Sequence, residues 1–307
     1  MNLQAILEEI QIEIQPLLGQ GKVADYIPAL ASADPMQFAM AITCQDGHVY
    51  SVGCDETLFS IQSISKVFTF TLALHLYGKE LYKRVWREPS GNPFNSLVQL
   101  EYEAGIPRNP FINAGAIVVS DTLVSHYKDA DRALDAILGF IREVSDDSDI
   151  NVDEEVARSE MQHRFRNAAL ANLMKSFENI DSEVSEVLQI YFKHCSVEMN
   201  VKKLSRAMLY LTNNGTDPLT NKSFVTPQQT KRINALMLTC GHYDASGDFA
   251  FSVGLPGKSG VGGGIVAVVP GKMSISVFSP ALNEQGNSLA GTKALELFTT
   301  KTGFSIF

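Results

Sequence analysis

Strand-forming patterns occur at both ends of this chain, whereas its middle has the spacing of helices. Residues 37–53 contain two apolar, β-prone runs around Asp46-Gly47, a pair that favours a type I′ hairpin turn. Near the other end, three further runs separated by glycine and proline are predicted strands: 249–254, 263–270 and 272–278. Segments from the two ends can therefore join into one antiparallel sheet of about five strands.

Helical spacing of apolar residues extends from residue 63 to about residue 241. One helix is predicted to begin at Thr226-Pro227, with an N-cap and a proline in the first turn, and to close at Cys240-Gly241. The other predicted helices of this region include 131–144, 168–180 and 201–215.

Two more helices are predicted, an amphipathic one at the N-terminus and a last one over roughly 287–299. We expect both on one face of the sheet and the helical insert on the other, which is an α+β architecture. The chain is predicted to be a single domain of residues 1–307. Its sheet subdomain would comprise about 1–62 and 242–307, and its helical subdomain about 63–241.

Composition excludes several classes of protein. The 307 residues carry a net charge of −9 without a basic cluster, which argues against a nucleic-acid partner. The longest apolar run, the ten residues after Val67, is far shorter than the roughly 20 needed to cross a bilayer, so no membrane association is expected. The N-terminus lacks the features of a signal peptide. The cysteines are scattered, which indicates reduced, buried thiols in a cytoplasmic protein: Cys44, Cys54, Cys195 and Cys240.

A lysine lies in the first turn of a helix that is predicted to be buried. Residues 63–78 are apolar and end at Gly78, a plausible C-cap, yet Lys66 places a cation at the positive end of the helix dipole. Ser63 shares its face, about 5–6 Å away at Cβ. An amine in an apolar setting can have its pKa lowered enough to take the proton of a serine hydroxyl. Alternatively, Ser63 is an N-cap and Lys66 a surface residue.

A second motif, Lys258-Ser259-Gly260, lies just before the predicted strand at 263–270. The combination of S-x-x-K on a helix and K-[ST]-G at a strand edge is seen in serine acyl-transfer enzymes of the penicillin-recognising type. Its glycine allows a substrate carbonyl to approach backbone N–H groups that form an oxyanion hole. The glycines of residues 260–264 precede a strand rather than follow one, so close packing explains them better than phosphate binding.

Across nearly its whole length the sequence resembles the serine-dependent glutaminases. The matching runs are ADYIPAL (24–30), FSIQSISKVF (59–68), EPSGNPFN (88–95), NPFINAGAIVV (109–119), SE (159–160), RN (166–167), YFKHCSVE (191–198), GHYDASGDFAFSVGLPGKSGVGGGI (241–265) and SPALNEQGNS (279–288). The resemblance implies a β-lactamase-like fold. It also implies hydrolysis of the side-chain amide of L-glutamine to glutamate and ammonia, in a homo-oligomer (dimer or tetramer).

The resemblance further implies the roles of site residues. Ser63 would attack the amide carbon, Lys66 would help to activate it, and Tyr26 or Tyr243 would shuttle a proton to the leaving ammonia. The backbone N–H groups of Ser63 and Val261 would form the oxyanion hole. The residues implied to surround the substrate are Gln62, Ser63, Asn113, Glu160, Asn167, Tyr191, Tyr243 and Val261. Which of Lys66, Tyr26 and Tyr243 acts as the base stays open.

These residues also suit glutamine chemically. A zwitterion needs an anion for its α-ammonium group, which Glu160 can supply, and neutral donors for its α-carboxylate, such as Asn113 and Asn167. Each has a structural alternative. Asn113 could be an N-cap, Glu160 and Asn167 could be exposed residues two turns apart on one helical face, and Tyr191 could belong to the core.

Other chemistries have weaker support. The six histidines have no metal-ligand spacing, so no metal or organic cofactor is predicted. Cys195 follows His194, but a neighbouring pair alone is weak support for a thiolate nucleophile. The run Tyr191-Phe192-Lys193 lacks the asparagine of the second penicillin-binding motif. A penicillin-recognising hydrolase acting on another acyl group, and a non-catalytic glutamine-binding protein, are the alternative functions.

Overall fold

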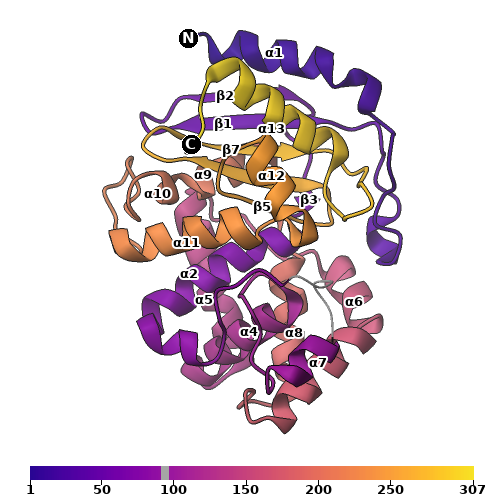
Figure 1. The fold of residues 1–307 in the computed structure, drawn as a ribbon, viewed down its shortest axis with the longest axis vertical. Coiled ribbons are helices and arrows are strands. Elements are labelled where there is room, and N and C mark those ends of the chain that lie inside the picture. Colours follow the sequence, from indigo (N-terminus) through magenta and orange to yellow (C-terminus); the bar gives the residue numbers. More distant parts are fainter. Residues whose placement is uncertain (91–96) are drawn as a thin grey trace.

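The computed structural model describes residues 1–90 and 97–307, and its centre is a five-stranded antiparallel sheet (Figure 1). Residues 91–95 of the run at 88–95 lie outside the described residues. The strand order is β2-β1-β7-β6-β5. The strands are β1 (Ala39–Cys44), β2 (Val49–Gly53), β5 (Gly257–Ser259), β6 (Gly264–Val269) and β7 (Met273–Phe278). The prediction that both ends of the chain build one antiparallel sheet is therefore confirmed.

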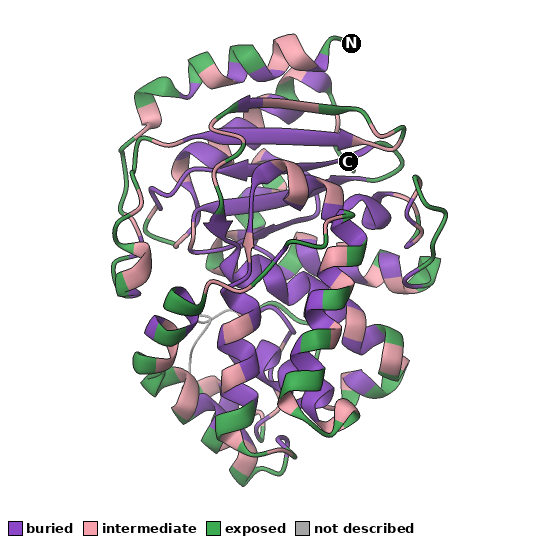
Figure 2. Cartoon of the chain, turned by 180° about the vertical axis from the view of Figure 1, so that it is seen from behind, coloured by how far each residue is buried: buried purple, intermediate pink, exposed green. Residues whose placement is uncertain are grey.

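The sheet is covered on both faces. The helices α1 (Leu3–Glu13) and α13 (Leu289–Thr302) pack on one face, where Phe298 and Ile275 are fully buried in the same apolar cluster. The other face carries α9 (Val201–Ala207), and the hydroxyl of Ser274 in β7 donates to the carbonyl of Ser205. Figure 2 shows the strands as mostly buried and the outer sides of the covering helices as exposed. The layered α+β prediction is confirmed.

Most of the remaining helices form a second body beside the sheet, whereas two of them, at residues 209–212 and 246–252, pack on the sheet itself (Figure 1). The centre of the second body is α2 (Ser65–Tyr77), which packs against α4, α5 and α11 and ends at the predicted C-cap, Gly78. The α-helices not yet named are α3 (Leu97–Tyr102), α4 (Asn113–Tyr127), α5 (Ala130–Ser145), α6 (Glu154–Gln162), α7 (Phe165–Ser176), α8 (Val184–Cys195), α10 (Leu209–Thr212), α11 (Pro227–Cys240) and α12 (Ser246–Ser252).

Short elements connect these layers. The two-stranded sheet of β3 (Phe59–Ser60) and β4 (Glu198–Met199) pairs Phe59 with Met199 and Ser60 with Glu198, residues that are far apart in the sequence. The 3₁₀ helices are η1 (Gln15–Leu17), η2 (Pro28–Leu30), η3 (Gln62–Ile64), η4 (Gly78–Lys83) and η5 (Tyr243–Ala245). Since η3 runs directly into α2, the predicted helix from residue 63 begins as a tighter 3₁₀ turn.

Several predicted elements match the structure. The segment at 131–144 lies within α5, and the last helix, predicted over 287–299, is α13. At the start of α11, Gln229 N–H donates to the Thr226 hydroxyl and Thr226 N–H donates to the Gln229 side chain, a reciprocal cap. The segment at 201–215 forms two short helices, α9 and α10, rather than one.

One predicted strand is wrong. Residues 249–254 lie mainly in α12, and the edge strand is β5, which includes Lys258. Short apolar runs do not distinguish a strand from a short helix by pattern alone. Here Phe249 is buried against His242, with ring centroids 3.5 Å apart, whereas Phe251 is 94% exposed. The K-S-G motif therefore lies on the edge strand itself.

The predicted hairpin between β1 and β2 is present, but its turn type is not. A type I′ turn needs positive φ at both central residues, whereas Gly47 has φ +89° and Asp46 is not in the left-handed region. Gly47 N–H donates to Cys44 O, and Cys44 N–H donates to His48 O, which makes the connection one residue longer. Gly47 is needed for its positive φ, as predicted, but the turn is of a different type.

The subdomain limits at residues 62 and 241 stay a prediction. Within that range, α9 packs on β1 and β7 of the sheet as well as on α5. No helix among residues 1–90 and 97–307 is both long and apolar enough to cross a membrane.

Candidate active site

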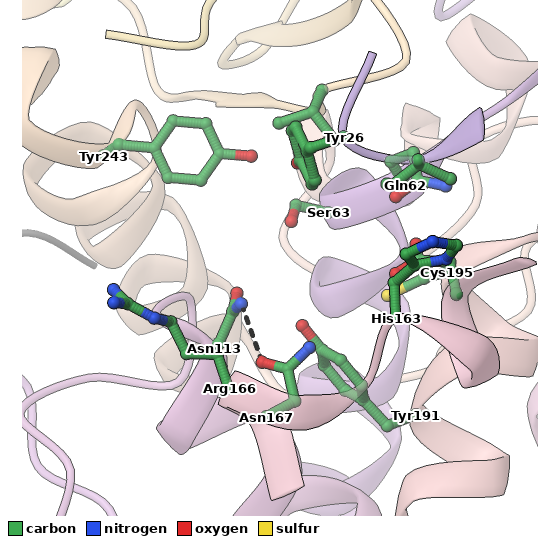
Figure 3. Close-up of a pocket in the computed structure, with 13 residues that line it drawn as sticks. Tyr26, Gln62, Ser63, Asn113, His163, Arg166, Asn167, Tyr191, Cys195 and Tyr243 are labelled. Atoms are coloured by element: carbon green, nitrogen blue, oxygen red, sulfur yellow. Dashed lines mark hydrogen bonds between the residues drawn. The ribbon is translucent and has the colours of Figure 1, made fainter. Parts of the chain in front are cut away.

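A cavity of about 350 Å³ lies where the start of α2 meets the loop after β5 (Figure 3). Of the predicted site residues, all except Lys66 line this cavity, and Lys66 lies directly beneath it, bonded to one of the lining residues. The lining residues are Tyr26, Ile27, Gln62, Ser63, Asn113, Glu160, His163, Arg166, Asn167, Tyr191, Cys195, Tyr243 and Val261.

Ser63 is presented by a strained turn. It follows β3 within η3, and the preceding residue, Gln62, has φ +49°, a left-handed conformation that side chains rarely adopt. Gln62 is held there by a hydrogen bond from its side-chain amide to the Ser60 hydroxyl, 2.9 Å. The turn leaves the Ser63 hydroxyl at the wall of the cavity and its backbone at the N-terminal end of α2, which favours negative charge.

The loop after β5 touches this turn at two glycines. A Cβ on Gly260 would lie 2.5 Å from Ile61 O and 3.3 Å from Ser63 N, and a Cβ on Gly262 would lie 2.3 Å from Ser60 O. Only glycine allows so close an approach of two backbones. Val261, between them, lines the cavity beside Ser63. Close backbone packing is thus the observed role of the glycines at 260–262.

Lys66 is completely buried one turn after Ser63. Its Nζ donates to Asn113 Oδ1 at 2.7 Å and to Phe111 O at 3.3 Å, and lies 5.7 Å from the centre of the Tyr191 ring. Neither of these hydrogen bonds goes to Ser63. Burial lowers the pKa of the Lys66 amine to about 8, so that a substantial fraction is neutral near physiological pH. The surface-residue alternative for Lys66 is excluded by its burial.

Tyr243 approaches Ser63 from η5. Burial raises the pKa of the Tyr243 hydroxyl, and its hydrogen bond with Ser63 acts in the opposite direction. Tyr243 itself has φ +53°, so both residues that frame the hydroxyl of Ser63 have left-handed backbones. Tyr26 also lines the cavity, and it stays 58% exposed. Figure 3 shows the Tyr243 hydroxyl pointing into the space beside Tyr26 and Ser63.

Glu160 is the carboxylate of the cavity. Burial raises its pKa to about 7, while its hydrogen bond with Gln62 and the nearby Lys66 lower it. Glu160 lies on α6 and Asn167 on α7, so the expectation that they share one helical face is wrong. The helix breaks at His163 and Arg164, and both side chains still reach the same cavity.

The amides of Asn113 and Asn167 are linked. Asn113 Nδ2 donates to Asn167 Oδ1 at 3.1 Å, a bond marked in Figure 3. Asn113 is the first residue of α4 and the N-cap position is Ile112, so Asn113 is not an N-cap. Tyr191, on α8, is 4% exposed and lines the cavity as well as packing in the core.

Four residues that line the cavity were not predicted from the sequence to do so: Ile27, His163, Arg166 and Cys195. Arg166 could have been found from the matched run RN, because a pocket for an α-carboxylate favours a nearby cation. Cys195 is completely buried, and burial raises its pKa to about 12, so its sulfur is a thiol rather than a thiolate. Its neighbour His194 instead bonds the hydroxyls of Ser65 and Ser120.

Metal-ligating side chains do not gather in the described part of the chain. Among residues 1–90 and 97–307, no three His, Cys, Asp or Glu side chains come close enough together to hold a metal ion.

The fold and the site define a class. A buried helix that begins with S-x-x-K, faced by a K-S-G edge strand of an antiparallel sheet, is the arrangement of proteins with the β-lactamase-like fold. Comparison with known proteins narrows this class: residues 21–307 match the glutaminase family model. The chain belongs to the glutaminase family.

Relatives and solved structures agree with this assignment. The chain is 65% identical to a glutaminase of Aliarcobacter butzleri over 307 residues, and 58% identical to one of Rhizobium rhizogenes over 306, with at least 99% of each chain covered. The structure of the probable glutaminase ybaS has a TM-score of 0.94 at 36% identity, with 99% of this chain and 98% of that chain covered. A probable glutaminase from Bacillus subtilis complexed with 6-diazo-5-oxo-L-norleucine has a TM-score of 0.90 at 32% identity, with 100% and 98% covered.

The burial of Cys195 predicts its reactivity. With a neutral thiol inside the protein, Cys195 should resist alkylation by iodoacetamide at neutral pH, whereas half-buried Cys54 should react first. Peptide mass spectrometry after timed labelling measures both sites, and labelling in urea provides the control in which both should react. Rapid modification of Cys195 in the folded protein would instead indicate an activated thiolate.

Proposed function

We propose that this protein hydrolyses the side-chain amide of L-glutamine to L-glutamate and ammonia through an acyl-enzyme on Ser63. The observation that carries the proposal is the cavity itself. It gathers a carboxylate, Glu160, and several amide and hydroxyl groups around a serine whose neighbour in the helix is a buried amine. Membership of the glutaminase family and the names of its relatives support the same substrate.

The charges of the cavity suit the two charged groups of glutamine. Glu160 would bind the α-ammonium group, and its raised pKa would fall when a cation arrives beside it. Asn167, Tyr191 and Tyr26 would donate to the α-carboxylate, with Arg166 adding a positive charge on the same wall. Asn113 would orient both partners, because it already bonds Lys66 and Asn167. The side-chain amide is then left facing Ser63.

The first half of the reaction would form an ester and release ammonia. Ser63 Oγ attacks the amide carbon, and Lys66, neutral at a pKa of about 8, takes the hydroxyl proton. Tyr243, hydrogen-bonded to Ser63, gives its proton to the leaving nitrogen, and the proton on Lys66 replaces it. The C–N bond breaks, ammonia carries away the proton that began on Tyr243, and the proton that began on Ser63 ends on Tyr243.

Backbone N–H groups would stabilise the intermediate. Gly260 and Gly262 hold the loop of Val261 against the Ser63 turn, which places two backbone segments on the same side of the attacking oxygen. The N–H groups of Ser63 and Val261 would donate to the oxyanion. In the second half, water attacks the glutamyl ester with the same groups in the reverse roles, and glutamate leaves.

We further propose that the protein is a homo-oligomer and acts in the cytoplasm. Large apolar side chains stay exposed on α3 and α7, which pack together: Val98 at 65%, Tyr102 at 88% and Phe165 at 77%. All four cysteines are free thiols, which is the usual state in a reducing compartment. Fractionation of cells followed by immunoblotting would test the location.

The exposed apolar surface predicts association. Light scattering should give a mass that is a multiple of 33.6 kDa, and Tyr102→Asp with Phe165→Asp should lower it, because a buried charge disfavours the contact. Phe251→Asp, an equally exposed phenylalanine on α12, is the control that should leave the mass unchanged. A wild-type mass of one chain would contradict the proposed oligomer.

Loss of the Ser63 hydroxyl should abolish turnover. Ser63→Ala should lower kcat by about 10⁴-fold or more, since no other group can form the ester. Ammonia release from glutamine, with glutamate measured in parallel, is the assay. Ser65→Ala is the matched control, because its hydroxyl bonds Gln62 O and His194 rather than the substrate side of the cavity. If Ser63→Ala kept wild-type turnover, another nucleophile would be required, and a chromogenic lactam would test the alternative acyl substrate.

The lowered pKa of Lys66 and the raised pKa of Glu160 predict how activity depends on pH. Lys66 must be neutral to accept a proton, so the active fraction rises as pH increases through about 8. Glu160 must be anionic to bind the α-ammonium group, so substrate binding improves as pH increases through about 7. The value of kcat/KM should therefore rise in two steps. Glu160→Gln should remove the lower step and raise KM, and a flat profile of the wild type from acid pH to 8 would contradict both assignments.

A further inference from the structure

The lysine of the K-S-G motif is buried without a carboxylate partner. Lys258 is fully buried in β5, and its Nζ donates to two carbonyl oxygens, Gly241 O at 2.9 Å and Ser259 O at 2.6 Å. No salt bridge to it occurs among residues 1–90 and 97–307. A buried amine of this kind is costly to keep, and packing alone would be better served by methionine or leucine.

Lys258 does not line the cavity, so it has no direct part in binding a substrate. Its Nζ instead lies 4.6 Å from the centre of the Tyr243 ring. A protonated amine at this distance is attracted to the π face of the ring, and although burial lowers the pKa of Lys258 well below its ordinary value, the neutral amine still packs against the same face. The amine of Lys258 therefore supports the ring of Tyr243 by packing against it.

The second contact of Lys258 fixes the backbone of the same residue. Gly241 O, two residues before Tyr243, accepts from Lys258 Nζ at 2.9 Å and from Ser259 N–H at 3.1 Å. A Cβ on Gly241 would lie 1.8 Å from Gly257 O, so the end of α11 is pressed against β5. These contacts hold the chain as it turns into Tyr243, whose φ of +53° is a strained conformation.

We propose that Lys258 is a positioning residue that holds the Tyr243 hydroxyl against Ser63. The amine of Lys258 packs against the ring of Tyr243 and donates to the carbonyl of Gly241, two residues before it. Both the ring and the backbone of Tyr243 are thereby fixed relative to the edge strand β5. The strand also carries the loop of Val261, so the proton donor and the proposed oxyanion donors share one support. The inference rests on the role of Tyr243 in the proposed function.

A purely structural role is the alternative, in which Lys258 only ties α11 to β5. The two roles differ in whether the effect of Lys258 depends on the Tyr243 hydroxyl. A structural tie would weaken stability whether or not Tyr243 has its hydroxyl. A positioning residue acts on catalysis only through that hydroxyl, so its effect should vanish once the hydroxyl has been removed.

The test is a double-mutant cycle on glutamine hydrolysis. Lys258→Met should lower kcat by about 10- to 100-fold and leave KM within about 3-fold, because substrate contacts are unchanged. In the Tyr243→Phe background the same substitution should lower kcat no further. Lys258→Gln, which keeps an N–H donor for Gly241 O, should retain more activity than Lys258→Met. Lys272→Met, which removes an exposed lysine lying over the ring of Phe304, is the control and should leave kcat unchanged.

Leaving-group dependence gives a readout that a structural role would not move. L-glutamic acid γ-p-nitroanilide releases a weaker base than ammonia, so its hydrolysis should lose less from Lys258→Met than glutamine hydrolysis does. Equal losses on both substrates, additive losses in the cycle, or wild-type kcat in folded Lys258→Met would each overturn the proposal.

A crystal structure of Lys258→Met, or of Lys258→Gln if only that variant folds, tests the inference without activity. The Tyr243 hydroxyl should be displaced from Ser63, and an unmoved tyrosine would overturn the positioning role. Wild-type protein that released no ammonia would contradict the proposed function instead, and the structural comparison would still decide the role of Lys258.

Discussion

The burial of Lys66 is the interaction on which the site depends. An amine at the first turn of a buried helix loses its hydration and receives only the side-chain oxygen of Asn113 and the carbonyl of Phe111 in return. That imbalance lowers its pKa to about 8. The neighbouring elements keep the amine of Lys66 buried, since α4 begins at Asn113 and α8 places the ring of Tyr191 over the amine. A carboxylate bonded to this amine would instead raise the pKa of Lys66 toward its usual range.

The topology explains how two distant motifs meet. The helical body is inserted between β2 and β5, so the chain leaves the sheet after β2, passes through β3 and through η3 with Ser63, and enters α2 at Ser65. It returns through α11 and η5 to the edge strand that contains Lys258. The start and the end of the insertion therefore lie side by side, which is where Ser63, Tyr243 and the loop of Val261 converge. The reactive groups occupy the junction because both connections have to pass through it.

The sequence predicted the layers and the S-x-x-K helix because these depend on patterns that repeat over many residues. Apolar alternation at both chain ends has few solutions other than one sheet, and Gly78 marks the end of α2 as expected. The predictions that were wrong depend on contacts of single residues. The run at 249–254 became a helix because Phe249 packs on His242, a contact between segments that no local pattern records. The break between α6 and α7 separates Glu160 from Asn167 although their spacing suits one helix.

The two buried lysines give the proposed proton transfer a direction. Burial, and after it the charge of Lys66, lowers the pKa of Lys258 well below its ordinary value. Under the proposed mechanism Lys66 becomes a cation when it takes the proton of Ser63, in a region where Lys258 already lies against the Tyr243 ring. Since a second positive charge there is disfavoured, Lys66 would pass its proton on to Tyr243, which under the proposal has given its own to the leaving nitrogen. The left-handed backbones of Gln62 and Tyr243 persist because Gly260, Gly262 and the Gly241 carbonyl hold the two segments in place.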